Sequence, residues 1–98
     1  MTEFKLIRNW AKKRGIIDNG DVKTQYIKLL EETGELAQAI LKDDTDEFVD
    51  AIGDCVVVLT NLAAIRGIDI EYCITSAYDE ICHRTGSMVN GTFVKDKK

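Results

Sequence analysis

Two short acidic stretches, each containing a glycine, interrupt an otherwise apolar helical pattern. They read Glu31-Glu32-Thr33-Gly34-Glu35 and Asp50-Ala51-Ile52-Gly53-Asp54. Ionised carboxylates are costly in apolar surroundings unless a positive charge neutralises them. Because an α-helix has about 3.6 residues per turn, Glu32 and Glu35 share one helix face, and Asp50 and Asp54 share another. Two such faces brought together would offer carboxylate oxygens to a hard divalent cation such as Mg2+.

The spacing of apolar residues predicts an all-α protein, with one domain over residues 1–98. Helices are expected from about residue 4 to the closing Gly15, and at about 21–42, 46–66 and 70–84, with a loop at 16–20 and a short irregular tail at 85–98. Asp21, Asp44 and Asp69 are the expected N-terminal caps. The third helix is apolar almost all round from 55 to 65, so it should be the most buried. The fourth should face inward through Tyr72, Cys73, Ile74, Ala77, Tyr78 and Ile81.

Gly34 and Gly53 are unusual inside predicted helices. Glycine costs roughly 1 kcal/mol relative to alanine at such a position. Each glycine immediately precedes an acid, Glu35 or Asp54. We therefore expect the two helices to approach closely where the carboxylates lie.

Composition narrows the function classes. Thirteen Lys and Arg against 17 Asp and Glu give a net charge of −4, which argues against binding a nucleic-acid polymer. Three cysteines without a C-x-x-C pair favour a reducing cytoplasm. The longest apolar run, residues 55–59, is too short for a bilayer, so we expect no membrane partner. Helices this apolar in a short chain favour self-association, as a dimer or a tetramer.

The acidic residues also have a simpler interpretation, as a solvated helix face near Lys28. We favour that interpretation for Glu31, which lies about 100° round the helix from Glu32. The role of Glu47 is ambiguous, because an acidic side chain near a helix N-terminus stabilises the helix whether or not it binds a metal. Asp54 is harder to dismiss, since apolar residues flank it.

The run Lys28-Leu29-Leu30-Glu31-Glu32-Thr33-Gly34-Glu35-Leu36, followed by Asp50-Ala51-Ile52-Gly53-Asp54 and an apolar helix, resembles the MazG-like nucleotide pyrophosphohydrolases. These are all-α proteins marked by E-x-x-E and then E-x-x-D on the next helix. The resemblance covers nearly the whole chain, because residues 10–16 and 84–93 are similar to the phage-type opening and ending. It implies a four-helix MazG-like bundle completed by oligomerisation.

The resemblance implies a metal site at matching positions. Glu32 and Glu35 match the first pair of ligands, and Asp54 matches the last aspartate. The family pattern would place a glutamate at position 51, where this chain has Ala51. Asp50, one turn before Asp54, is the nearest replacement, and Glu47 is a further candidate. The expected ion is Mg2+, with Mn2+ as an alternative.

The activity implied is hydrolysis of a ribo- or deoxyribonucleoside triphosphate to a monophosphate and pyrophosphate. Glu32 or Glu35 would be the catalytic base. Lys28 would reach a phosphate or pair with a neighbouring glutamate on the surface. Trp10 would stack on a base or anchor the first helix. Arg84 and Lys95 would close over the polyphosphate or belong to a solubilising tail.

Other functions remain compatible with the sequence. The chain could be a noncatalytic helical module that binds nucleotides or a partner, with catalysis lost through Ala51. Phosphoribosyl-nucleotide hydrolysis, performed by relatives of similar fold, is another alternative. A di-iron carboxylate bundle is set aside, because the chain lacks Glu-x-x-His pairs.

Overall fold

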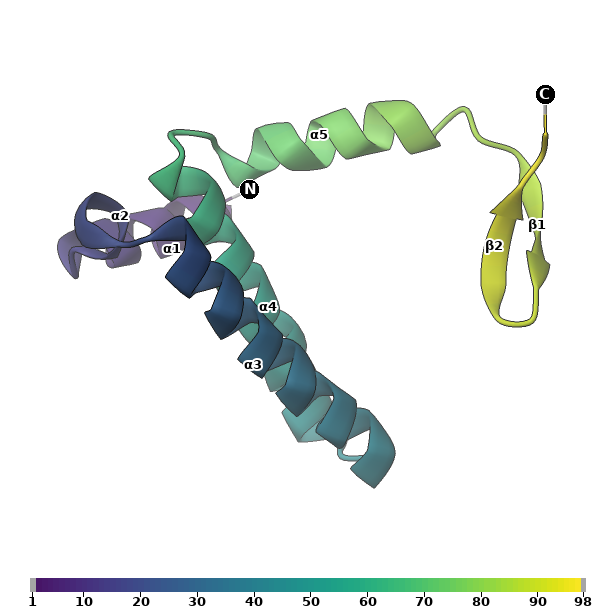
Figure 1. Cartoon of the computed structure of the whole chain (residues 1–98), viewed down its shortest axis with the longest axis horizontal. Helices are drawn as coiled ribbons and strands as arrows, with labels where there is room; N and C mark the ends of the chain where they lie inside the picture. Colours follow the sequence, from purple (N-terminus) through teal and green to yellow (C-terminus); the bar gives the residue numbers. More distant parts are fainter. Residues whose placement is uncertain (1, 98) are drawn as a thin grey trace.

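The computed structural model describes residues 2–97, so Met1 and Lys98, the ends of the predicted domain, lie outside the described residues. The described chain is mostly helical, as predicted, and ends in a small β-hairpin (Figure 1). In chain order the elements are α1 (Thr2–Lys13), α2 (Ile16–Asn19), α3 (Val22–Lys42), α4 (Thr45–Ile65), α5 (Ile70–Ile81), β1 (Gly86–Val89) and β2 (Thr92–Lys95).

The long helices α3 and α4 form an antiparallel pair that dominates the fold (Figure 1). Their N-termini are capped by the predicted aspartates. The Asp21 carboxylate accepts a hydrogen bond from Thr24 N at 3.0 Å, and the Asp44 carboxylate accepts one from Glu47 N at 3.0 Å. Asp43, with φ of 55°, ends α3 and begins the reversal into α4. The tight connection sets α3 against α4 along their length.

Helix α4 is the central element, as its composition predicted. It contacts α1, α2, α3 and α5. Its buried residues are Ala51, Val58, Thr60, Asn61 and Ala63. By length and mean hydropathy, α4 is also long and apolar enough to cross a membrane. The uninterrupted apolar run at residues 55–59, on which the sequence-based expectation rests, is too short to indicate this. The core helices of soluble proteins share this length and composition; in α4, 28% of the most apolar 18-residue window is buried within the chain.

The predicted loop at 16–20 is wrong, because most of it forms the short helix α2. Gly15 takes the left-handed conformation at φ 78°, which turns the chain after α1. Its carbonyl then accepts hydrogen bonds from Asn19 N at 2.9 Å and from Asn19 Nδ2 at 3.2 Å. A single turn of helix thus forms where the turn residues Asp18-Asn19-Gly20 suggested a loop.

The predicted irregular tail is also wrong. Gly86 pairs with Lys95 and Val89 with Thr92 in an antiparallel hairpin. Asn90 and Gly91 link the strands at φ 51° and 85°. Positive φ at both central residues is the geometry of a two-residue type I′ turn, for which Asn-Gly is a preferred sequence. Alternating apolar residues around Asn-Gly were therefore a hairpin signal.

The inward-facing prediction for the fourth helix is wrong as well. Helix α5 projects away from the α3–α4 pair and carries the hairpin at its far end (Figure 1). It has no buried residue, and Tyr78 is 62% exposed. Its N-terminal end is held by Arg8 of α1, which donates two hydrogen bonds to the Glu71 carboxylate, one of them at 2.8 Å. Asp69 makes no cap hydrogen bond with its side chain and lies 3.9 Å from Arg8 Nε.

The expected close approach at the two glycines does not occur. A Cβ atom added to Gly34 or Gly53 would meet nothing within 4 Å. Both glycines therefore lie on open faces of their helices. Among small residues it is the alanines that are buried, including Ala39 on α3 and Ala51 on α4.

Candidate metal centre

Three carboxylates converge between α3 and α4. Glu32 and Glu35 come from α3, and Asp54 comes from α4. One oxygen from each lies within 4.8 Å of the others. Because the two glutamates are three residues apart, helical spacing places them on one face, and the antiparallel pairing brings Asp54 opposite. The structure thus brings together three of the four predicted ligands.

Glu32 is the buried member of the cluster, at 8% exposure. Its Oε1 lies 3.4 Å from Lys28 Nζ, one turn earlier on α3. Its Oε2 is buried without a hydrogen-bond partner among the described residues. An unpartnered buried carboxylate oxygen is costly, and a bound cation would satisfy it. Three clustered carboxylates with one orphaned oxygen fit a hard divalent metal.

Crowding of negative charge perturbs the titration of the cluster. The pKa of Glu35 is raised, first because its carboxyl can share a proton with Glu32 in a hydrogen bond and then because Glu32 repels it. The pKa of Asp54 is raised by burial first, and then by repulsion from Asp50 and Glu32. Burial and the same acids raise the pKa of the Cys55 thiol, which disfavours the thiolate. The site is therefore built to attract positive charge.

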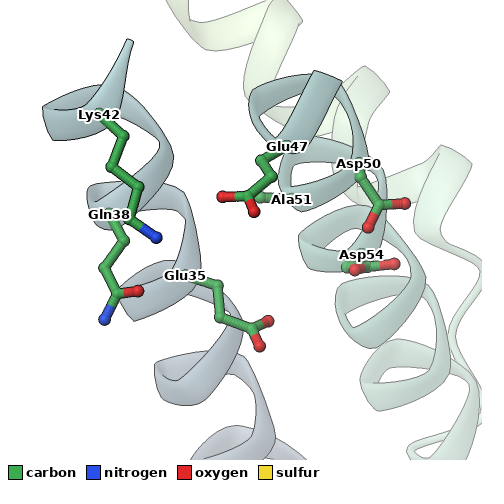
Figure 2. Close-up of a pocket in the computed structure, with 7 residues that line it drawn as sticks. All are labelled: Glu35, Gln38, Lys42, Glu47, Asp50, Ala51 and Asp54. Atoms are coloured by element: carbon green, nitrogen blue, oxygen red, sulfur yellow. The ribbon is translucent and has the colours of Figure 1, made fainter. Parts of the chain in front are cut away.

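A pocket of about 300 Å³ opens beside the cluster (Figure 2). Glu35 extends from α3 toward α4, and Glu47 extends from α4 toward α3. Sequence reasoning missed Gln38 and Lys42 as lining residues. They follow Glu35 at spacings of three and seven, which is the signal that would have found them. The full lining is Glu35, Gln38, Lys42, Glu47, Asp50, Ala51 and Asp54.

Asp50 and Ala51 occupy different places in this pocket. Asp50 lies outside the three-carboxylate cluster but close enough to raise the pKa of Asp54. Ala51 is 4% exposed and lines the pocket between the helices. The position where the family pattern has a glutamate therefore faces the site, and its side chain here is a methyl group.

The four predicted substrate-binding residues fall into two groups. Lys28 contacts the cluster through Glu32 and shares a groove with Trp10, whose ring lies 4.6 Å from the Arg14 guanidinium carbon. Trp10 is 45% exposed, so it is not a buried anchor. Arg84 and Lys95 line a separate pocket with residues from the end of α5 and the base of the hairpin. Figure 1 shows the hairpin at the far end of α5 from the α3–α4 pair. Within one chain they lie away from the carboxylates.

Residues 20–88 match the family model for the MazG nucleotide pyrophosphohydrolase domain. The match covers more than half of the 98 residues and includes α3, α4 and α5. The chain belongs to the MazG family. The acidic residues of both helices lie inside the matched MazG region, so the converging carboxylates are part of the family domain.

A protein of Haemophilus phage HP1 (strain HP1c1) is 42% identical over 66 residues, which is 67% of this MazG chain. It is described as an uncharacterized 18.2 kDa protein in the rep-hol intergenic region. The aligned region spans about 40% of that relative's length. The comparison with solved structures found no match.

Proposed function

We propose that this MazG domain is a Mg2+-dependent nucleoside triphosphate pyrophosphohydrolase that releases a nucleoside monophosphate and pyrophosphate. The observation that carries the proposal is the cluster of Glu32, Glu35 and Asp54 with the unpartnered Glu32 oxygen. A protein of net charge −4 would repel a polyphosphate unless a cation lay between them. Membership of the MazG family supports the same reaction class.

We assign separate roles in metal binding, phosphate contact and proton transfer to residues of this chain. Glu32, Glu35 and Asp54 would hold the ion, with Asp50 beside them. A divalent cation supplies charge neutralisation at phosphate oxygens and orients them for attack by water. Lys28 lies 3.4 Å from Glu32 and would contact a phosphate. Glu35 is exposed in the pocket, whereas Glu32 is buried beside Lys28. We therefore assign the Glu35 oxygen that does not hold the ion as the acceptor of the water proton.

A second copy of the chain would complete the bundle. Exposed apolar residues run along α5, including Ile74, Tyr78 and Ile81, and α4 exposes Ile52 and Leu59. We propose that α5 packs against a partner subunit. Arg84 and Lys95, which lie away from the carboxylates of their own chain, would then contact polyphosphate from the partner. The proposal accounts for the exposed faces and for the distant basic residues together.

The test replaces one proposed metal-binding side chain with an uncharged side chain of nearly the same shape. Asp54→Asn should lower Mg2+-dependent pyrophosphate release by at least about 100-fold, because the amide cannot supply an anionic ligand. It should also abolish the rise in Tm that Mg2+ gives the native protein. Asp46→Asn, the same change at an exposed position of α4, is the matched control. Nucleoside triphosphates with ribose and deoxyribose are assayed for pyrophosphate and for orthophosphate.

The noncatalytic alternative predicts a different result. A nucleotide-binding or partner-binding module would give no pyrophosphate with any nucleotide, while remaining folded with Mg2+ or Mn2+ present. Turnover retained in Asp54→Asn would contradict the proposed site.

A further inference from the structure

A stripe of apolar and small residues runs along α3 on the side turned away from α4. We call it the outer stripe, and it consists of Ile27, Leu30, Gly34, Ala37 and Leu41. These positions lie roughly half a turn round the helix from the buried Glu32 and Ala39. All five are exposed, and Leu41 is 86% exposed. A helix face covered only by water is normally polar, so the outer stripe is suited to burial against another helix.

The spacing within the outer stripe is that of a seam between packed helices. Its members recur at alternating intervals of three and four residues, the spacing by which one helix contacts another along its length. Gly34 lies at the centre, where glycine costs roughly 1 kcal/mol relative to alanine. A Cβ atom there would meet nothing within 4 Å, so packing within one chain does not require glycine. A second helix that approaches the outer stripe closely would require it.

Helix α5 has the length and the exposed face to cover the outer stripe. Its 12 residues extend about 18 Å, and the stripe extends about 21 Å from Ile27 to Leu41. Ile74, Tyr78 and Ile81 share one face of α5 and are 48%, 62% and 51% exposed. Figure 1 shows α5 projecting away from α3 of its own chain. An α5 that covers this stripe therefore belongs to a second copy.

Charge selects the direction in which the two helices would run. The segment after α3, residues 43–47, holds four acids and no basic residue: Asp43, Asp44, Asp46 and Glu47. The segment after α5, residues 82–97, holds three Lys and Arg residues against one acid: Arg84, Lys95 and Lys97 against Asp96. A parallel arrangement brings these opposite charges together, whereas an antiparallel one places the basic residues beside Lys23 at the start of α3.

We propose that the outer stripe of α3 is the docking face for α5 of a second copy, with the two helices parallel and Tyr78 near Gly34. By two-fold symmetry each α5 covers the α3 of the other copy, so the contact is made twice. Arg84 and Lys95 of the second copy then lie near Lys42, which lines the pocket beside the carboxylates. Only this contribution to a polyphosphate site rests on the proposed function.

Gly34→Leu tests the outer stripe, because in a single chain the added side chain meets open space. The variant should keep its helical content by circular dichroism. Its self-association should weaken about tenfold or more, since the side chain overpacks a seam formed around glycine. Sedimentation equilibrium over a range of concentrations measures the dissociation constant. Gly53→Leu, the same change at the glycine of α4 that also faces open space, is the matched control and should associate like native protein.

Leu30→Glu is a second test at a position that is 52% exposed in the single chain. A charge in an apolar seam is costly, so this variant should also weaken association about tenfold or more. Equal dissociation constants in Gly34→Leu and Gly53→Leu, or native association in Leu30→Glu, would overturn the proposal.

Thiol cross-linking tests the direction of α5 in protein that carries Cys55→Ala and Cys82→Ser, so that Cys73 is the remaining native thiol. In the parallel arrangement Leu30→Cys lies near the partner's Cys73 and should give a covalent dimer with a short thiol-to-thiol cross-linker. Leu41→Cys lies about 16 Å further along α3 and should not. Adding Cys73→Ser should abolish the cross-link. Cross-linking through Leu41→Cys in preference to Leu30→Cys, or through neither, would overturn the proposal.

Association and cross-linking are measured without metal or nucleotide, so they are independent of hydrolysis. If the cross-linked native-like dimer releases no pyrophosphate with Mg2+ and nucleoside triphosphates, the proposed function fails and the docking face stands. If monomeric Leu30→Glu releases pyrophosphate at the native rate, the contribution of Arg84 and Lys95 from a second copy is overturned while the hydrolase stands.

Discussion

At the scale of single residues, some buried polar atoms of this chain have no hydrogen-bond partner. Glu32 and Asn61 are both buried, and each has one oxygen without a hydrogen bond among the described residues. Core positions normally satisfy such atoms, and a cation bound by the carboxylate cluster would satisfy the Glu32 oxygen. Ala51 shows the reverse situation, with an apolar side chain facing an acidic pocket.

Ala51→Glu restores the family pattern and tests how many carboxylates the site needs. The pocket of about 300 Å³ has room for the longer side chain. The variant should bind Mg2+ more tightly, because a further anionic ligand faces the ion. Without metal the variant should be less stable than the native protein, because the added carboxylate lies among other negative charges. Calorimetric titration with Mg2+ and thermal unfolding with and without it measure both effects. Ala51→Gln is the uncharged control, and equal Mg2+ affinity in the two variants would contradict the expectation.

At the scale of elements, an ion pair helps to hold α5 against the rest of the molecule. Arg8 on α1 donates two hydrogen bonds to Glu71 in the first turn of α5. Contacts between α4 and α5 are few by comparison with those between α3 and α4. The direction in which α5 leaves the helical core therefore depends on this pair.

The pair makes stability depend on pH in a defined window. The hydrogen bond from Arg8 lowers the pKa of Glu71 from 4.5 to about 2. A carboxyl whose pKa is lower in the folded protein stabilises the fold above its unfolded pKa, and the contribution is lost as pH falls through the folded pKa. Native protein should therefore unfold at a higher temperature than Glu71→Gln above pH 4.5, with the difference vanishing toward pH 2. Glu80→Gln, which removes an exposed ion pair between α5 and Arg84 just beyond its end, is the control. A difference independent of pH would contradict the assignment.

At the scale of the whole molecule, the single chain is more extended than a compact domain of the same length. Its radius of gyration is 16.0 Å, whereas a compact domain of this size has about 13 Å. The excess comes from α5 and the hairpin, which project from the helical core (Figure 1). Exposed apolar residues on this projection, Tyr72, Ile74, Tyr78, Ile81, Met88 and Phe93, are suited to burial against another subunit.

Tyr78→Glu tests that expectation. At a solvent-exposed helix position the change should alter stability by less than about 0.5 kcal/mol. In an apolar interface a charge is costly, so the variant should dissociate into monomers. Sedimentation equilibrium measures the mass, and Tyr78→Phe should keep the native association. A native protein that is monomeric at micromolar concentrations would contradict the proposed partner.

Much of the secondary structure could be predicted from local signals. Asp21 and Asp44 cap α3 and α4 as expected, because an N-cap depends on backbone groups within three residues. The hairpin was equally local, and the Asn90-Gly91 signal for it was overlooked. The outward course of α5 could not be predicted, because an apolar helix face does not specify whether its own chain or another molecule covers it.

The sequence by itself determined where α3 and α4 lie along the chain, the shared faces of the acidic residues and the MazG pattern, since each follows from residue spacing over a few turns. Only the tertiary structure decided that Glu32 and Asn61 are buried, each with one oxygen that has no hydrogen-bond partner among residues 2–97. It also decided that Gly34 and Gly53 face open space, and that Arg84 and Lys95 line a different pocket from the carboxylates. The physical reason is that burial and distance depend on contacts between helices, whereas periodicity describes one helix at a time.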